Sequence, residues 1–210
     1  MSEQFRTFLE VLCSPSDAIR QGDLLRAPWL PLGLNIAAYC LIAVIHLSAP
    51  KTGITVPQAL ADANSVEHNV TFMATAAAIS ICLPVLFALF LYLPINIVCL
   101  RRLRFVDYFA IYMWCLVPSQ VGLLIDALAA LAKGSANPFG DSLLANSLPH
   151  RFQHGTLFAI MSSISLFQLW SISILFIAVV RFTRCRWQWV AFWVGFPEVI
   201  FMFFRAGRAA

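Results

Sequence analysis

Long uninterrupted runs of apolar residues dominate the chain and predict membrane-spanning helices. A helix needs about 20 predominantly apolar residues to cross about 30 Å of hydrocarbon. Five runs meet this requirement, at about 29–47, 72–100, 108–131, 156–180 and 187–204. The second run is over-long, and its two prolines are expected to kink it. The pattern predicts an all-α integral membrane protein in which residues 29–210 form a bundle of five transmembrane helices.

The first 28 residues have the periodicity of short amphipathic helices. Four apolar residues recur at intervals of three and four and so share one side of a helix: Phe5, Phe8, Leu9 and Leu12. Ser14 followed by Pro15 is typical of a second helix start. We expect helices at about 3–12 and 15–24 on the cytoplasmic face. They lie either along the membrane surface or packed under the bundle.

Composition supports this assignment and excludes a water-soluble globule. Hydrophobic residues make up 60% of the chain and charged residues only 11%, whereas a soluble domain carries about 25% charged residues. The net charge of +4 raises the question of nucleic-acid binding. The basic residues, however, sit singly or in threes beside apolar runs instead of forming one solvated patch, so we expect no nucleic-acid partner.

The placement of the basic residues predicts the orientation. Nine of the 14 lysines and arginines fall in the N-terminal segment and in the second–third and fourth–fifth connections: Arg6, Arg20, Arg26, Arg101, Arg102, Arg104, Arg181, Arg184 and Arg186. Basic residues are enriched on the cytoplasmic side of membrane proteins. We therefore expect a cytoplasmic N-terminus and an external C-terminus, in a multi-pass protein of the bacterial inner membrane.

The six cysteines predict a reduced, disulfide-free protein. All of them fall in spans or on the predicted cytoplasmic side, and no CxxC motif occurs: Cys13, Cys40, Cys82, Cys99, Cys115 and Cys185. Disulfides are rare in the reducing cytosol, and a buried thiol behaves as a small apolar group.

Two acidic residues lie within the predicted spans, Asp126 in the third and Glu198 in the fifth. Ionisable groups inside a membrane are costly and point to function by default. Asp126 shares a helical face with Ser119 and Gly122, and Glu198 shares one with Ala191 and Gly195; such small-residue faces favour helix contacts. We expect both acids to point inward at similar depth.

These acids, together with Ser119 and Gln168, form a candidate intramembrane polar site. One interpretation is a proton- or cation-linked site. The other is structural: each carboxyl caps a broken helix, is protonated, or pairs with a nearby basic group. Gln168 belongs to a polar stripe at steps of three, which either bonds helices together or lines a hydrophilic path; its other members are Ser162, Ser165 and Ser171.

Two further features concern the ends of the spans. His150 and His154 stand four residues apart in a predicted external loop, a spacing that suits a metal or proton site, although no cysteine accompanies them. Tryptophans follow two arginines at the start of the fifth span, as in an aromatic belt at a membrane interface; the residues are Arg184, Arg186, Trp187, Trp189 and Trp193.

Catalytic signatures are absent from the sequence. The chain contains no HExxH, GxSxG, P-loop or GxGxxG motif. We therefore expect a protein that is not an enzyme and that has no resident cofactor or metal.

Four segments carry a resemblance to a known family. Residues 8–19 contain a small residue and proline, then two other residues, and then alanine and a hydrophobic residue. Residues 27–32 lead into the first span, residues 105–118 open with a polar-aromatic step and end on a proline, and Leu169 with Trp170 stands in the fourth span. In these features and in span count the chain resembles the Yip1 family of five-span membrane proteins.

The resemblance implies a non-enzymatic protein that works by binding partners. Eukaryotic members are associated with vesicle trafficking and small GTPases, and some bacterial members are encoded beside transporters. We therefore expect an accessory or scaffold subunit that contacts the lipid bilayer and binds other integral membrane proteins or a second copy of itself. The alternative is a small ion- or proton-coupled carrier that uses Asp126 and Glu198.

Overall fold

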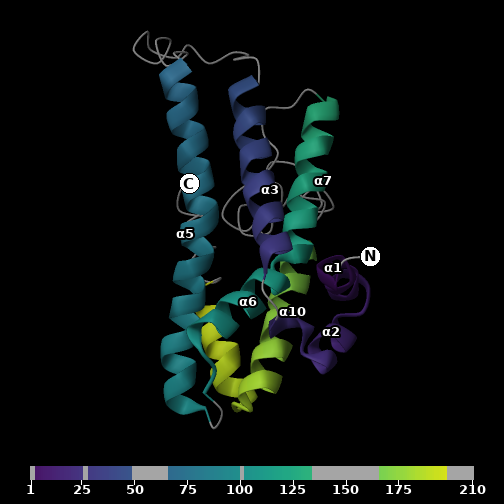
Figure 1. The fold of residues 1–210 in the computed structure, drawn as a ribbon, viewed down its shortest axis with the longest axis vertical. Helices are drawn as coiled ribbons and strands as arrows, with labels where there is room; N and C mark the ends of the chain where they lie inside the picture. The colour runs from purple at the N-terminus through teal and green to yellow at the C-terminus, as the bar shows by residue number, and fades with distance from the viewer. Residues whose placement is uncertain (1–2, 26–27, 49–65, 100–101, 134–165, 198–210) are drawn as a thin grey trace, which may run out of the picture.

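The protein is almost entirely helical in the part of the chain that its computed structural model describes, residues 3–25, 28–48, 66–99, 102–133 and 166–197 (Figure 1). The elements are α1 (Glu3–Cys13), α2 (Pro15–Gln21), the 3₁₀ turn η1 (Asp23–Leu25), α3 (Trp29–Ser48), α5 (Val66–Val98), α6 (Phe105–Cys115), α7 (Val117–Lys133) and α10 (Leu166–Thr183). A further helix covers residues 187–197.

Three helical stretches among the described residues are long and apolar enough to cross a membrane: Ala77–Val98, Phe105–Ile125 and Leu166–Thr183. They lie within or overlap the second, third and fourth predicted spans. α3 and the helix over 187–197 lie where the first and fifth were expected. Parts of the fourth and fifth expected spans, 156–165 and 198–204, are outside the described residues.

Two expected helices differ in detail from the prediction. α5 has 33 residues and continues through both Pro84 and Pro94, so its length at 1.5 Å per residue is about 50 Å. The third expected span is divided, because α6 ends at Cys115 and α7 begins at Val117, with Leu116 as the C-cap of α6. Pro118 lies just beyond this point, at the second position of α7, where a helix tolerates proline.

The core is centred on α6. Among its fully buried side chains are Tyr108, Ile111, Met113 and Trp114. α6 packs against α5 and η1, and also contacts α10. In Figure 1 it runs obliquely between the lower part of α5 and the lower end of α7. A helix that is apolar on every side can be buried in this way.

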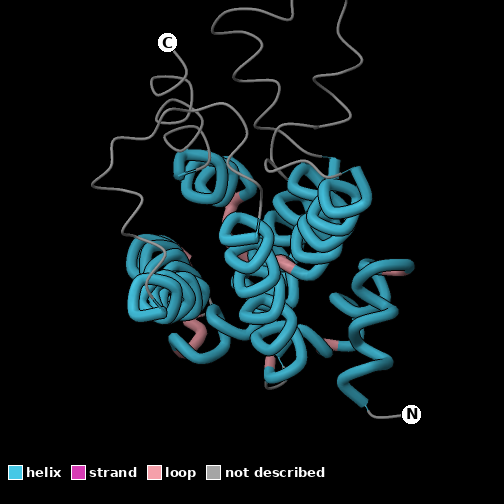
Figure 2. Tube along the Cα trace, turned by 90° about the horizontal axis from the view of Figure 1, so that it is seen from above, coloured by secondary structure: helices cyan, strands magenta, loops and turns pink. Residues whose placement is uncertain are grey.

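The N-terminal segment packs against the bundle. α1 and α2 lie where the two short helices were expected, although α2 already ends at Gln21. α1 lies across the long axis of the bundle beside α7 (Figures 1 and 2). Its most buried residues are Thr7 and Val11, both fully enclosed. Phe5 and Leu9 of the predicted stripe stay 43% and 38% exposed. The side of α1 that faces the bundle is therefore centred on Thr7 and Val11, and is rotated away from the side that the apolar spacing predicted.

Candidate functional site

The predicted polar stripe of the fourth span makes direct contact with α7. The Ser171 hydroxyl of α10 accepts a hydrogen bond from the Ser119 backbone N–H at 3.0 Å, and the two serine hydroxyls lie 2.8 Å apart. The Ser119 hydroxyl also donates to the Phe167 carbonyl at 3.4 Å. The sequence left two uses open for the stripe, bonding helices together or lining a hydrophilic path. At Ser171 the observed use is a bond between helices.

The division of the third span explains why this contact exists. Ser119 is the third residue of α7, and the first N–H groups of a helix have no partner within the helix. A buried N–H without a partner is costly, especially where water is excluded. The Ser171 hydroxyl supplies the missing acceptor from the neighbouring helix.

Gly122 lets the same two helices approach closely. A Cβ added at this position would lie 2.5–2.8 Å from Cδ2, Cγ and Cβ of Phe167, closer than side-chain atoms pack. The absence of a side chain is therefore required. The small-residue face predicted on the third span is used for a helix contact, with α10 as its partner.

The matching face on the fifth span has a different environment. Ala191 is exposed, and apart from the local backbone of its own helix no described atom lies within 4 Å of a Cβ built on Gly195. Within the part of the chain that is described, this face is open rather than packed against a helix.

The remaining predicted site residues are only partly placed. Gln168 lies in α10, beside Phe167, and is half-buried. Asp126 is within α7, but its side chain is outside the described part, as are Glu198, His150 and His154 altogether. The two acids of the candidate polar site are therefore not brought together by any described contact.

A second polar contact joins α3 and α5 and follows from Pro84. Proline lacks an N–H, so the carbonyl four residues earlier, that of Ser80, loses its helical donor. The Asn35 side chain of α3 donates a hydrogen bond to this carbonyl at 2.5 Å. Asn35 and Ser80 are both buried. The sequence contained the signal for this pair, a proline within a span, but not the identity of the partner.

Gln120 is a buried polar residue that sequence reasoning missed. Its side chain is 3% exposed, and neither its amide nitrogen nor its amide oxygen has a hydrogen-bond partner among the described residues. Such a group costs about 1–3 kcal/mol. It follows Ser119 directly, but neighbouring residues of a helix project about 100° apart, so the two side chains leave α7 in different directions.

Charged and polar side chains attach the N-terminal segment. Arg6 lies 3.4 Å from the Glu10 carboxylate and 3.6 Å from that of Asp23, which is almost completely buried. Burial raises the pKa of Glu10, and its hydrogen bond with Asp23 raises the pKa further, against the lowering effect of Arg6. The Gln4 side chain accepts a hydrogen bond from the Leu30 N–H at 2.9 Å, at the start of α3.

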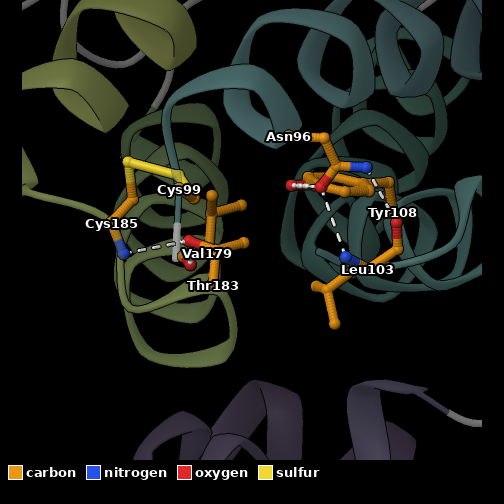
Figure 3. The surroundings of a disulfide bond; sticks show 7 residues. All are labelled: Asn96, Cys99, Leu103, Tyr108, Val179, Thr183 and Cys185. Atoms are coloured by element: carbon orange, nitrogen blue, oxygen red, sulfur yellow. Dashed lines mark hydrogen bonds between the residues drawn. A yellow bond between two sulfur atoms is a disulfide. The ribbon is translucent and has the colours of Figure 1, made fainter. Parts of the chain in front are cut away.

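Asn96 orders the connection between α5 and α6. Its amide group donates to the Leu103 carbonyl at 2.8 Å and accepts from the Leu103 N–H at 3.2 Å. The Tyr108 hydroxyl donates to the same side chain at 3.1 Å (Figure 3). At the start of α6, Arg104 and Asp107 form a capping box.

A disulfide joins this connection to the one after α10, and the expectation of a disulfide-free protein is wrong. Cys99 and Cys185 are bonded, with their Cα atoms 4.8 Å apart (Figure 3). They are 86 residues apart in the chain, so no local motif could reveal the pair. Only the packing of the bundle brings the ends of α5 and α10 together. The other four cysteines are free.

No group of three metal-ligating side chains occurs in the described segments. Comparisons with models of known protein families, with curated proteins and with solved structures found no match for this chain. The resemblance to the Yip1 family therefore stays a prediction.

Proposed function

We propose that the protein is a non-enzymatic integral membrane protein of five spans. In this proposal it serves as an accessory or scaffold subunit and binds other membrane proteins. The observation that carries the proposal is the use of polar side chains within the described segments. Those of Asn35, Asn96, Ser119 and Ser171 bond neighbouring helices or a connection between them, and so stabilise helix packing rather than converge on a substrate.

The outward side chains support the same role. Leu86 of α5, Ile125 of α7 and Ile177 of α10 are 59%, 50% and 52% exposed. Apolar side chains at this level of exposure suit contact with lipid and with the helices of other membrane proteins. Following the arginine distribution, the proposal places the N-terminus in the cytoplasm of a bacterium and the C-terminus outside its inner membrane. The Cys99–Cys185 bridge counts against this orientation, because it joins two connections on the cytoplasmic side and disulfides are rare in the reducing cytosol.

The N-terminal segment would provide a second contact surface. It is held to the bundle by the Gln4–Leu30 hydrogen bond and by Arg6, while Phe5 and Leu9 remain exposed. A rigidly attached helix with exposed apolar side chains favours the recognition of a partner near the membrane surface.

Site-specific photo-crosslinking in intact membranes tests the proposal. A photoreactive amino acid is placed at Leu86, Ile125 or Ile177, and the products are identified by mass spectrometry after purification in mild detergent. Ile111, which is fully buried, is the control position. We expect one or a few membrane proteins to be captured from exposed positions and none from the control.

Recovery of the protein alone, without a protein adduct from any exposed position and as a monomer in several detergents, would refute the proposal. Adducts between two copies of the chain would show that the exposed positions mediate self-association instead of binding to other membrane proteins. The carrier alternative predicts instead that Asp126→Asn and Glu198→Gln abolish ion flux into vesicles while leaving the crosslinks unchanged.

A further inference from the structure

Exposed arginines gather where α5 leads into α6 and where α10 ends. Arg102 stands in the first connection, Arg181 in the last turn of α10, and Arg184 and Arg186 in the connection after it. All four side chains are exposed. None forms an ion pair with a carboxylate of the described residues. These four residues are called the arginine cluster below.

The disulfide joins the two connections that carry this cluster. Arg184 and Arg186 flank Cys185, and Arg102 follows Cys99 by three residues. Adjacent Cα atoms are 3.8 Å apart, and the bridged Cα atoms are 4.8 Å apart. The Cα atoms of Arg184 and Arg186 therefore lie within about 9 Å of that of Cys99. Arg184 also adopts a left-handed conformation, with φ of 53°, which is uncommon for a residue with a side chain.

A fifth arginine, Arg104, differs from the cluster because a carboxylate of the chain neutralises its charge. Arg104 bonds both carboxylate oxygens of Asp107 at 3.2 and 3.3 Å. Its charge is therefore compensated within the chain, although the side chain is exposed. The arginine cluster has no such compensation among the described residues, and several uncompensated positive charges on two joined connections favour an anionic ligand.

Exposed tryptophans lie directly beside the arginine cluster. Trp187 and Trp189 are 61% and 47% exposed, and they follow Arg186 in the chain. Tryptophan is enriched at the level of the lipid headgroups, where its ring meets both apolar chains and water. The guanidinium group matches phosphate with paired hydrogen bonds. Both side-chain types therefore suit a phospholipid.

We propose that the arginine cluster, held together by the Cys99–Cys185 bridge, binds the phosphate headgroup of an anionic phospholipid. The exposed indoles of Trp187 and Trp189 lie along the upper part of its acyl chains. The proposal rests on insertion into a bilayer, as the proposed function does, but it requires no protein partner. A lipid assay on the purified protein can therefore fail or succeed independently of the crosslinking experiment.

The test is the quenching of tryptophan fluorescence by dibrominated phosphatidylglycerol in phosphatidylcholine vesicles that contain the purified full-length protein. The measured quantity is the preference for phosphatidylglycerol over phosphatidylcholine. A basic residue near an anionic surface contributes about 1 kcal/mol, or about fivefold in affinity. Arg186→Gln should therefore lower the preference about fivefold, and Arg184→Gln together with Arg186→Gln should lower it further.

Arg104→Gln is the matched control, since it removes an arginine from the same end of the molecule whose charge Asp107 already compensates. It should leave the preference unchanged. Reduction of the disulfide with a phosphine, or the Cys99→Ser variant, should lower the preference toward that of Arg186→Gln, because the two connections are no longer joined.

Three results would overturn the proposal. Equal effects of Arg186→Gln and Arg104→Gln would show that only total charge matters. If the preference for phosphatidylglycerol is unchanged after reduction, lipid binding does not depend on the Cys99–Cys185 bridge. Displacement of the lipid by inorganic phosphate, beyond that caused by chloride at equal ionic strength, would identify a site for soluble phosphate instead.

Discussion

Replacement of Gly122 by alanine tests the contact between α7 and α10 most directly. The new Cβ would lie 2.5 Å from Cδ2 and 2.8 Å from Cβ of Phe167. Rotation of the ring moves Cδ2 but leaves the Phe167 Cβ in place, because that atom is fixed to the backbone. The two helices must therefore separate, which lengthens the bonds between Ser119 and Ser171.

The expected magnitude follows from two opposing effects. Alanine is favoured over glycine within a helix by about 1 kcal/mol. Overpacking costs about 1–3 kcal/mol, and hydrogen bonds between membrane helices contribute about 0.6 kcal/mol and at most about 1.7 kcal/mol. We expect Gly122→Ala to lower the free energy of unfolding by about 1–3 kcal/mol.

Gly33→Ala is the matched control. Gly33 lies in α3, and apart from the local backbone of that helix no described atom is within 4 Å of a Cβ built there. The same substitution should therefore leave stability unchanged or raise it by up to about 1 kcal/mol. Both variants are compared by unfolding in mixed micelles of sodium dodecyl sulfate and a mild detergent, followed by tryptophan fluorescence.

A Gly122→Ala protein as stable as wild type, or stabilised to the same extent as Gly33→Ala, would refute the close contact. A double-mutant cycle with Phe167→Ala sharpens the result. If the clash with Phe167 causes the loss, most of the loss should disappear in the Phe167→Ala background.

Four further predictions use the same preparation. Ser171→Ala should lower the free energy of unfolding by about 0.6–1.7 kcal/mol in the micelle titration, and no loss would show that its bond contributes nothing. Gln120→Met should raise stability by about 1–3 kcal/mol, since it removes a buried amide without a described partner; a lower stability would indicate that the amide is satisfied. The raised pKa of Glu10 means that the folded protein binds this proton more tightly than the unfolded chain, so the stabilisation is present below the usual pKa of 4.5 and is lost as the pH rises through the raised value. Proteolysis of the N-terminal segment should therefore be slower at pH 5 than at pH 8, and the difference should vanish in Glu10→Gln. Alkylation of the unreduced, denatured protein should modify only the four free cysteines, with two more after reduction; six without reduction would contradict the bridge.

Several local predictions agreed with the structure because they depend only on patterns of residues that are close together in the sequence. A helix hides its own backbone polar groups, so a long apolar run in a bilayer has few structures open to it, and apolar runs marked out α5 and α10. Pro15 marked the first residue of α2. Steps of three along the fourth span indicated a polar face, and Ser171 makes the interhelical bonds expected of that face.

Other features depended on neighbours distant in the chain. The sequence alone determined the approximate positions of most helices and which polar residues they carry, since helix formation and apolar burial respond to residues within a few turns. Only the tertiary structure decided that Asn35 bonds the carbonyl freed by Pro84, that Thr7 and Val11 form the inward side of α1, and that Cys99 meets Cys185. Each of these contacts depends on the relative rotation and height of two packed helices. That geometry is set jointly by side chains from both helices, as Gly122 and Phe167 set it between α7 and α10.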